Sequence, residues 1–116
     1  QNVGRAGVSV AWVNEGGESG LPYDLVLYDT EVDPPTAVAY VEVKTSSAIN
    51  KPPFEVSLRE LQFAEECGPS YYIYRLAGLG GRPTLVRIQD PARHIKSGRL
   101  SLLCVVAADG QTEAHN

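Results

Sequence analysis

The sequence has few of the residues that build disulfide frameworks or zinc centres, namely two cysteines and two histidines. Cys67 and Cys104 lie far apart and show no C-x-x-C spacing, so we expect both thiols to be reduced and buried, as in an intracellular protein. His94 and His115 do not have zinc-ligand spacing. No apolar run is long enough to span a bilayer, so we expect no membrane partner.

Positive charge is scarce in the first part of the chain. Residues 1–43 contain one basic residue, Arg5, against seven acidic ones. From residue 67 to residue 108 the balance reverses, with six basic residues against Asp90 alone. This asymmetry fits a carboxylate cluster with basic flanks that could meet phosphates, although ordinary solvated positions produce the same pattern about as often.

Two runs rich in β-branched and aromatic residues, 24–29 and 37–44, flank a Pro-Pro turn and predict a β-hairpin. Side chains alternate across a strand, so Tyr40, Glu42 and Lys44 share one face. If the two runs pair antiparallel, Asp24 lies across from Glu42, although a slip of one residue would separate them. Two carboxylates and a lysine on one patch are the chemistry of a metal-dependent phosphodiester-cleaving site.

The other elements follow from local signals. Residues 8–13 alternate as a strand, Ser57 and Glu60 form a capping box for a helix through about Glu66, and Asp90 caps a short helix that ends before Gly98. Further strands are predicted at residues 71–76, 84–88 and 100–107. The order is βββαββαβ, which indicates an α/β or α+β domain with a mixed central sheet over residues 1–107 and a polar tail at 108–116.

Longer motifs support a family resemblance. The arrangement of Asp24, Glu42-Val43-Lys44 and a helix carrying Gln62 resembles the PD-(D/E)xK nuclease superfamily. More narrowly, Glu18-Ser19-Gly20-Leu21-Pro22-Tyr23-Asp24 and Tyr40-Val41-Glu42-Val43-Lys44 look like the C-terminal domains of NO VEIN proteins, and the likeness covers most of the chain. The resemblance implies a restriction-endonuclease-like fold with helices flanking the sheet.

The resemblance also implies roles for single residues. Asp24 and Glu42 would hold Mg²⁺ or Mn²⁺, with the Val43 carbonyl as a third ligand. Lys44 would orient or deprotonate the attacking water, or neutralise the negative charge that develops on the phosphorus group. Gln62 would position water or phosphate. The family's N-terminal Gly-Arg-x-Gly-Glu segment is not complete, because Val8 follows Gly7 directly, so Glu15 or Glu18 would have to supply the missing acid.

Several polar residues are candidates for contact with a nucleic-acid substrate. They are Thr45, Ser46, Lys51, Arg75, Arg82 and Arg87. The chain would then be a Mg²⁺- or Mn²⁺-dependent endonuclease, a hydrolase that acts on DNA or RNA, and the resemblance implies that it belongs to a larger nuclear protein with further domains.

Each residue also has a simpler interpretation. Glu42 and Lys44 alone are more typical of an exposed ion pair, and Glu60 is explained by capping. The main alternative function is a catalytically silent nuclease-like scaffold that binds nucleic acid or protein. A predicted exposed aromatic strand, from Tyr71 to Tyr74, favours that alternative.

Overall fold

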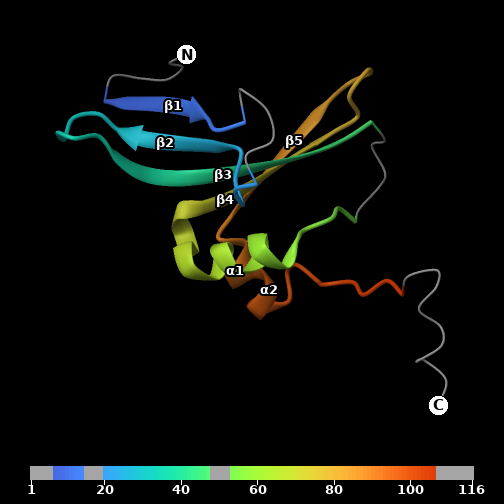
Figure 1. Cartoon of the computed structure of the whole chain (residues 1–116). Coiled ribbons are helices and arrows are strands. Elements are labelled where there is room, and N and C mark those ends of the chain that lie inside the picture. Colours follow the sequence, from blue (N-terminus) through green and yellow to red (C-terminus); the bar gives the residue numbers. More distant parts are fainter. Residues whose placement is uncertain (1–6, 15–19, 48–52, 107–116) are drawn as a thin grey trace.

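The structure is a computed structural model that describes residues 7–14, 20–47 and 53–106. The described residues form five strands, two α-helices and a single 3₁₀ turn (Figure 1). In chain order these are β1 (Val8–Trp12), β2 (Leu25–Asp29), β3 (Thr36–Ser46), α1 (Leu58–Cys67), η1 (Gly68–Ser70), β4 (Tyr71–Ala77), β5 (Thr84–Gln89) and α2 (Pro91–Ser97).

The strands form one mixed sheet in the order β1-β2-β3-β4-β5. Only β3 and β4 are parallel, and α1 makes the crossover that a parallel pair requires. The other neighbours are antiparallel, so the predicted α+β class and the predicted mixed sheet are confirmed. Within the described ranges, no helix has the length and apolar character to cross a membrane.

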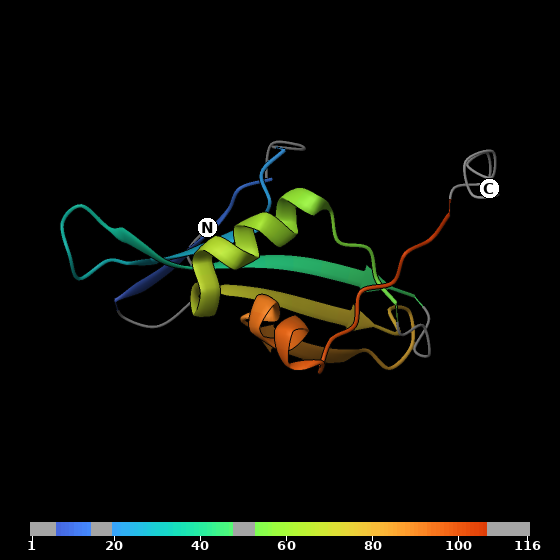
Figure 2. The ribbon, with the colours of Figure 1, turned by 90° about the horizontal axis from the view of Figure 1, so that it is seen from below.

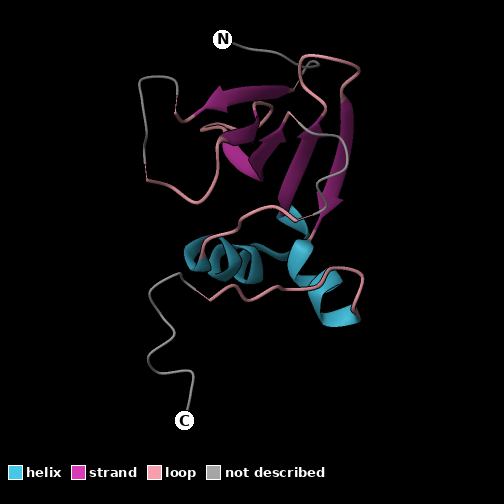
Figure 3. Cartoon of the chain, turned by 90° about the vertical axis from the view of Figure 1, so that its right-hand side faces the viewer, coloured by secondary structure: helices cyan, strands magenta, loops and turns pink. Residues whose placement is uncertain are grey.

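Both helices lie on the same face of the sheet (Figures 2 and 3). The core on that face is built from Ala64 of α1 and from Tyr71 and Ile73 of β4, all of them buried. Tyr23, Tyr40 and Phe63 pack around these residues, and the rings of Tyr40 and Phe63 meet edge to face at 5.1 Å. Burial of several large rings supplies most of the packing energy in so small a domain.

The predicted helix caps are present. Ser57 accepts a hydrogen bond from the Glu60 N–H at 3.1 Å, and the Glu60 carboxylate accepts from the Ser57 N–H at the same distance. Asp90 caps α2 by accepting from the Arg93 N–H, and it does so with a left-handed backbone. The local signals therefore located both helix starts correctly.

The prediction of a last strand at residues 100–107 is wrong. Residues 101–106 are extended but belong to no strand, and their apolar side chains are exposed, with Leu103 at 72% and Val105 at 81%. An apolar run becomes a strand only where a neighbour completes its ladder, and no described strand lies beside this one. Cys104, expected to be buried, is therefore exposed, and Cys67 is half-buried. Ala107 and the expected tail at 108–116 lie outside the described residues.

The aromatic residues of β4 divide between the two faces. Tyr71 is completely buried, contrary to the expected exposed aromatic strand, because it points toward α1. Tyr72 and Tyr74 are half-buried on the other face, where their rings meet at 6.2 Å. No helix among the described residues covers that face (Figure 3).

Candidate functional site

Asp24 joins the start of β2 to the middle of β3. Its N–H donates to the Val41 carbonyl at 2.8 Å, and its Oδ2 accepts from the Val43 N–H at 2.8 Å. The strand register, with Leu25 opposite Val41, places Asp24 beside Glu42. Asn14 donates to the other carboxylate oxygen, Oδ1, at 2.6 Å. The hairpin register thus brings Asp24 beside Glu42, as the sequence pattern predicts.

Glu42 and Lys44 project from β3 toward α1. The Lys44 Nζ lies 3.3 Å from Glu42 Oε2, and the two side chains are 18% and 11% exposed. So little exposure distinguishes this pair from the solvated surface ion pair that the two residues alone would suggest. Because each ion is largely removed from water, the pair must be supported by further polar contacts.

Glu60, in the first turn of α1, supplies that support. Its Oε1 lies 3.0 Å from Lys44 Nζ, while the same carboxylate caps the helix at Ser57. The charge of Glu60 also acts on Glu42, whose pKa it raises. A carboxylate on each side of the lysine makes a compact cluster of Asp24, Glu42, Lys44 and Glu60, here called the acid–lysine cluster.

Burial raises the pKa of Glu42 from 4.5 to about 7, with Glu60 and Asp24 adding to the rise through repulsion and Lys44 opposing it. For Lys44, burial lowers the pKa, but the hydrogen bond and charge of Glu60, followed by those of Glu42, outweigh burial and raise it. Lys44 is therefore fully charged at neutral pH, whereas Glu42 exchanges its proton there. A second positive charge entering the cluster would ionise Glu42.

Gln62 does not join this cluster. It is exposed on α1, where it lines a surface pocket of ≈ 500 Å³ with Leu61, Glu65 and Glu66. It lies two positions beyond Glu60, which turns its side chain roughly 200° around the helix axis from the face that meets Lys44. The catalytic role predicted for Gln62 is therefore not supported by its position.

The residues predicted to contact nucleic acid do not form one surface. Arg75 is buried beside Lys44 in the strand register, with its guanidinium 5.3 Å from the Phe54 ring centroid. Ser46 lies on the same face, but Thr45 and Arg87 lie on the face without helices, where Arg87 stacks on Tyr74. Arg82 is exposed in the turn between β4 and β5. Lys51, Glu15 and Glu18 lie outside the described residues.

The cluster offers a divalent cation a small set of oxygen donors. No three His, Cys, Asp or Glu side chains in the described parts of the chain are arranged as a metal site. Asp24 and Glu42 remain as a pair, and Mg²⁺ is commonly held by one or two carboxylates together with water and substrate phosphate. The Val43 N–H faces Asp24, and the carbonyl of a strand residue points to the same side as its N–H. These donors fit Mg²⁺ or Mn²⁺.

Two residues of the site were missed by sequence reasoning. Glu60 was explained by its cap alone, although its place in the first turn of the crossover helix α1 put it above β3. Asn14, which donates a hydrogen bond to Asp24, lies in the stretch Trp12-Val13-Asn14-Glu15 that resembles the family, but it was given no role in the site. Antiparallel pairing of β1 with β2 could have found it, because Trp12 lies opposite Leu25.

Comparisons with known proteins point to a single family. A family model described as "Protein NO VEIN, C-terminal" matches residues 1–88. The Arabidopsis thaliana protein NO VEIN is 35% identical over 97 residues, which cover 84% of this chain and 3% of that protein. NO VEIN-LIKE from the same plant is 34% identical over 97 residues, covering 84% of this chain and 14% of that protein. No solved structure matches.

Proposed function

Since this chain belongs to the family of NO VEIN C-terminal domains, and since its acid–lysine cluster follows the PD-(D/E)xK pattern, we propose that it is a metal-dependent phosphodiesterase domain acting on nucleic acid. The observation that carries the proposal is that Asp24, directly before β2, lies beside Glu42 of β3, whose carboxylate is 3.3 Å from the Lys44 Nζ. The proposal includes a restriction-endonuclease-like fold, to which the antiparallel β1–β2–β3 meander and the parallel β3–β4 crossover correspond.

Each residue would have a separate task. Asp24 and Glu42 would hold Mg²⁺ or Mn²⁺, which when bound polarises a phosphoryl oxygen and lowers the pKa of bound water. Lys44 would donate hydrogen bonds to the phosphoryl oxygens as negative charge develops on them. Glu60 would fix the position of Lys44, because it approaches the ammonium from α1 at 3.0 Å.

Calorimetric titration of Mn²⁺ tests the metal site. We expect saturable binding to the wild type and at least about tenfold weaker binding to Glu42→Gln, which removes one anionic ligand while keeping its shape. Glu55→Gln is the matched control, because Glu55 is exposed and lies in the loop before α1. Equal Mn²⁺ affinity in wild type and Glu42→Gln would refute a site between the two carboxylates.

Cleavage assays on DNA and RNA test the activity. We expect Lys44→Ala to lower the Mn²⁺-dependent cleavage rate by about 100-fold or more, because the charge on the transferred phosphoryl group loses its donor. Lys96→Ala is the control, since Lys96 forms a similar 2.9 Å pair with Glu65 but on the open surface. Cleavage that survives unchanged in Lys44→Ala would exclude the assigned role.

A catalytically silent interaction module is the second candidate. Both Asp24 oxygens accept hydrogen bonds within the protein, and Lys44 is held between two carboxylates, so the cluster is also consistent with a purely structural role. The open sheet face with Tyr72 and Tyr74 would then be the binding surface. Metal-independent retention of nucleic acid or protein partners, without Mn²⁺ binding, would favour this candidate. Under either proposal, the domain would be part of a longer nuclear protein with further domains.

A further inference from the structure

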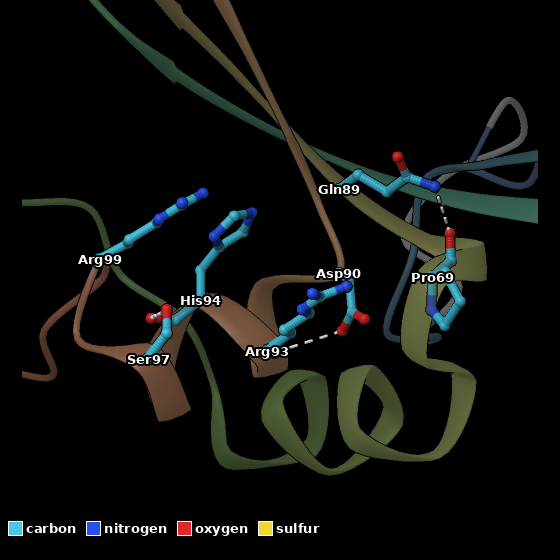
Figure 4. Close-up of a pocket in the computed structure, with 7 residues that line it drawn as sticks. All are labelled: Pro69, Gln89, Asp90, Arg93, His94, Ser97 and Arg99. Atoms are coloured by element: carbon cyan, nitrogen blue, oxygen red, sulfur yellow. Dashed lines mark hydrogen bonds between the residues drawn. The ribbon is translucent and has the colours of Figure 1, made fainter.

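A polar pocket separate from the acid–lysine cluster lies between the end of β5, α2 and the segment that follows α2 (Figure 4). Its volume is ≈ 460 Å³. None of its residues belongs to the acid–lysine cluster. The polar side chains that line it are Gln89, Asp90, Arg93, His94, Ser97 and Arg99.

The pocket has an excess of positive charge. Two arginines, Arg93 and Arg99, face one carboxylate, Asp90, and the Asp90 oxygen Oδ1 already accepts the Arg93 N–H at 3.2 Å as the helix cap; the His94 ring adds a further polar group. Among the described residues, none of these three side chains forms an ion pair. Figure 4 shows the His94 ring and the Arg99 guanidinium extending in the same direction into this space.

Two guanidiniums and an imidazole that line one cavity match the oxygens of a phosphate group. Arginine presents parallel N–H donors that bind phosphate in a bidentate manner, and charge-assisted hydrogen bonds of this kind are stronger than neutral ones. A phosphate monoester, with three terminal oxygens, offers one more acceptor than a backbone diester. A volume of ≈ 460 Å³ also leaves room for the organic group that carries the phosphate, within the usual range of small-molecule sites.

We propose that this pocket binds the 5′-phosphate monoester of a nucleotide, held by Arg93, His94 and Arg99. The nucleotide could be free or stand at the end of a nucleic-acid strand, because both sources present the same group. The site is independent of the proposed metal-dependent activity, since no residue is shared. Gln89 supports its wall through a 3.0 Å hydrogen bond from Nε2 to the Pro69 carbonyl.

Titration of the domain with adenosine 5′-monophosphate tests the proposal. We expect saturable binding that is at least about tenfold weaker in Arg99→Gln and weaker still in Arg93→Gln/Arg99→Gln, because each change removes a charge-assisted donor. Both arginines are exposed, so neither substitution should unfold the domain. Arg59→Gln removes the same charge outside the pocket, on the exposed surface of α1, and should bind as the wild type does.

Oligonucleotides distinguish the two sources. Tighter binding of a 5′-phosphorylated oligonucleotide than of the free nucleotide, lost when the phosphate is removed, would identify strand ends as the ligand. Equal binding with and without the 5′-phosphate, or adenosine 5′-monophosphate binding that is unchanged in Arg93→Gln/Arg99→Gln, would overturn the proposal. Glu42→Gln should retain nucleotide binding, so failure of the metal site and failure of this pocket can be told apart.

Discussion

At the scale of single residues, Glu42 makes the stability of the domain depend on pH. Its pKa rises from 4.5 to about 7 on folding, so the folded state binds its proton more tightly than the unfolded chain does. The stabilisation is complete below pH 4.5, the unfolded value, and is lost as the pH rises through about 7. We expect the wild type to lose stability on the order of 1–3 kcal/mol between these limits.

Glu42→Gln should abolish that loss, because glutamine cannot ionise. Urea denaturation at about pH 5 and about pH 8 measures the free energy of unfolding of both proteins. As the pH rises, the stability of the variant relative to the wild type should increase. Glu55→Gln should follow the wild type at both pH values. An identical pH dependence in Glu42→Gln and wild type would show that Glu42 does not carry the shift.

At the scale of elements, the segment that was predicted as a strand gives a test. Leu102 and Leu103 are 61% and 72% exposed, so Leu102→Asp/Leu103→Asp should change the free energy of unfolding by less than about 0.5 kcal/mol. Ile73→Ala in the core should cost about 2–5 kcal/mol under the same conditions. A large loss in the leucine variant, measured by urea denaturation, would mean that this segment is buried in the folded domain.

The loop before β2 depends on β4 for its position. The buried Tyr71 hydroxyl donates to the Pro22 carbonyl at 2.7 Å, two residues before Asp24. Burial, followed by the nearby carboxylates Glu42, Glu60 and Asp24, raises the pKa of Tyr71, which therefore remains a donor. We expect Tyr71→Phe to cost about 1–3 kcal/mol by leaving this carbonyl without its partner, and also to weaken Mn²⁺ binding.

Tyr72→Phe is the control for that substitution, because Tyr72 lies half-buried on the other face of the sheet. Thermal denaturation and calorimetry should show both losses in Tyr71→Phe and neither in Tyr72→Phe. Unchanged stability in Tyr71→Phe would show that the hydrogen bond from Tyr71 to the Pro22 carbonyl contributes little.

At the scale of the whole molecule, one sheet separates two unlike surfaces. The helical face contains the aromatic core, the acid–lysine cluster and the phosphate pocket, and the face with Tyr72 and Tyr74 has no helix among the described residues. Placing α1 across β3 and β4 is what brings Glu60 to Lys44. The cluster is thus a product of the crossover as much as of the hairpin.

Alternation, capping residues and turn prolines were enough to locate both α-helices and all five strands of the described residues, because these signals act over a few neighbouring residues. The same alternation placed Glu42 and Lys44 on one face of β3. The segment at 101–106, the position of Gln62 and the second carboxylate on Lys44 were decided only by the tertiary structure. Ladder partners, helix rotation and burial arise from residues distant in the chain, so no local pattern contains them.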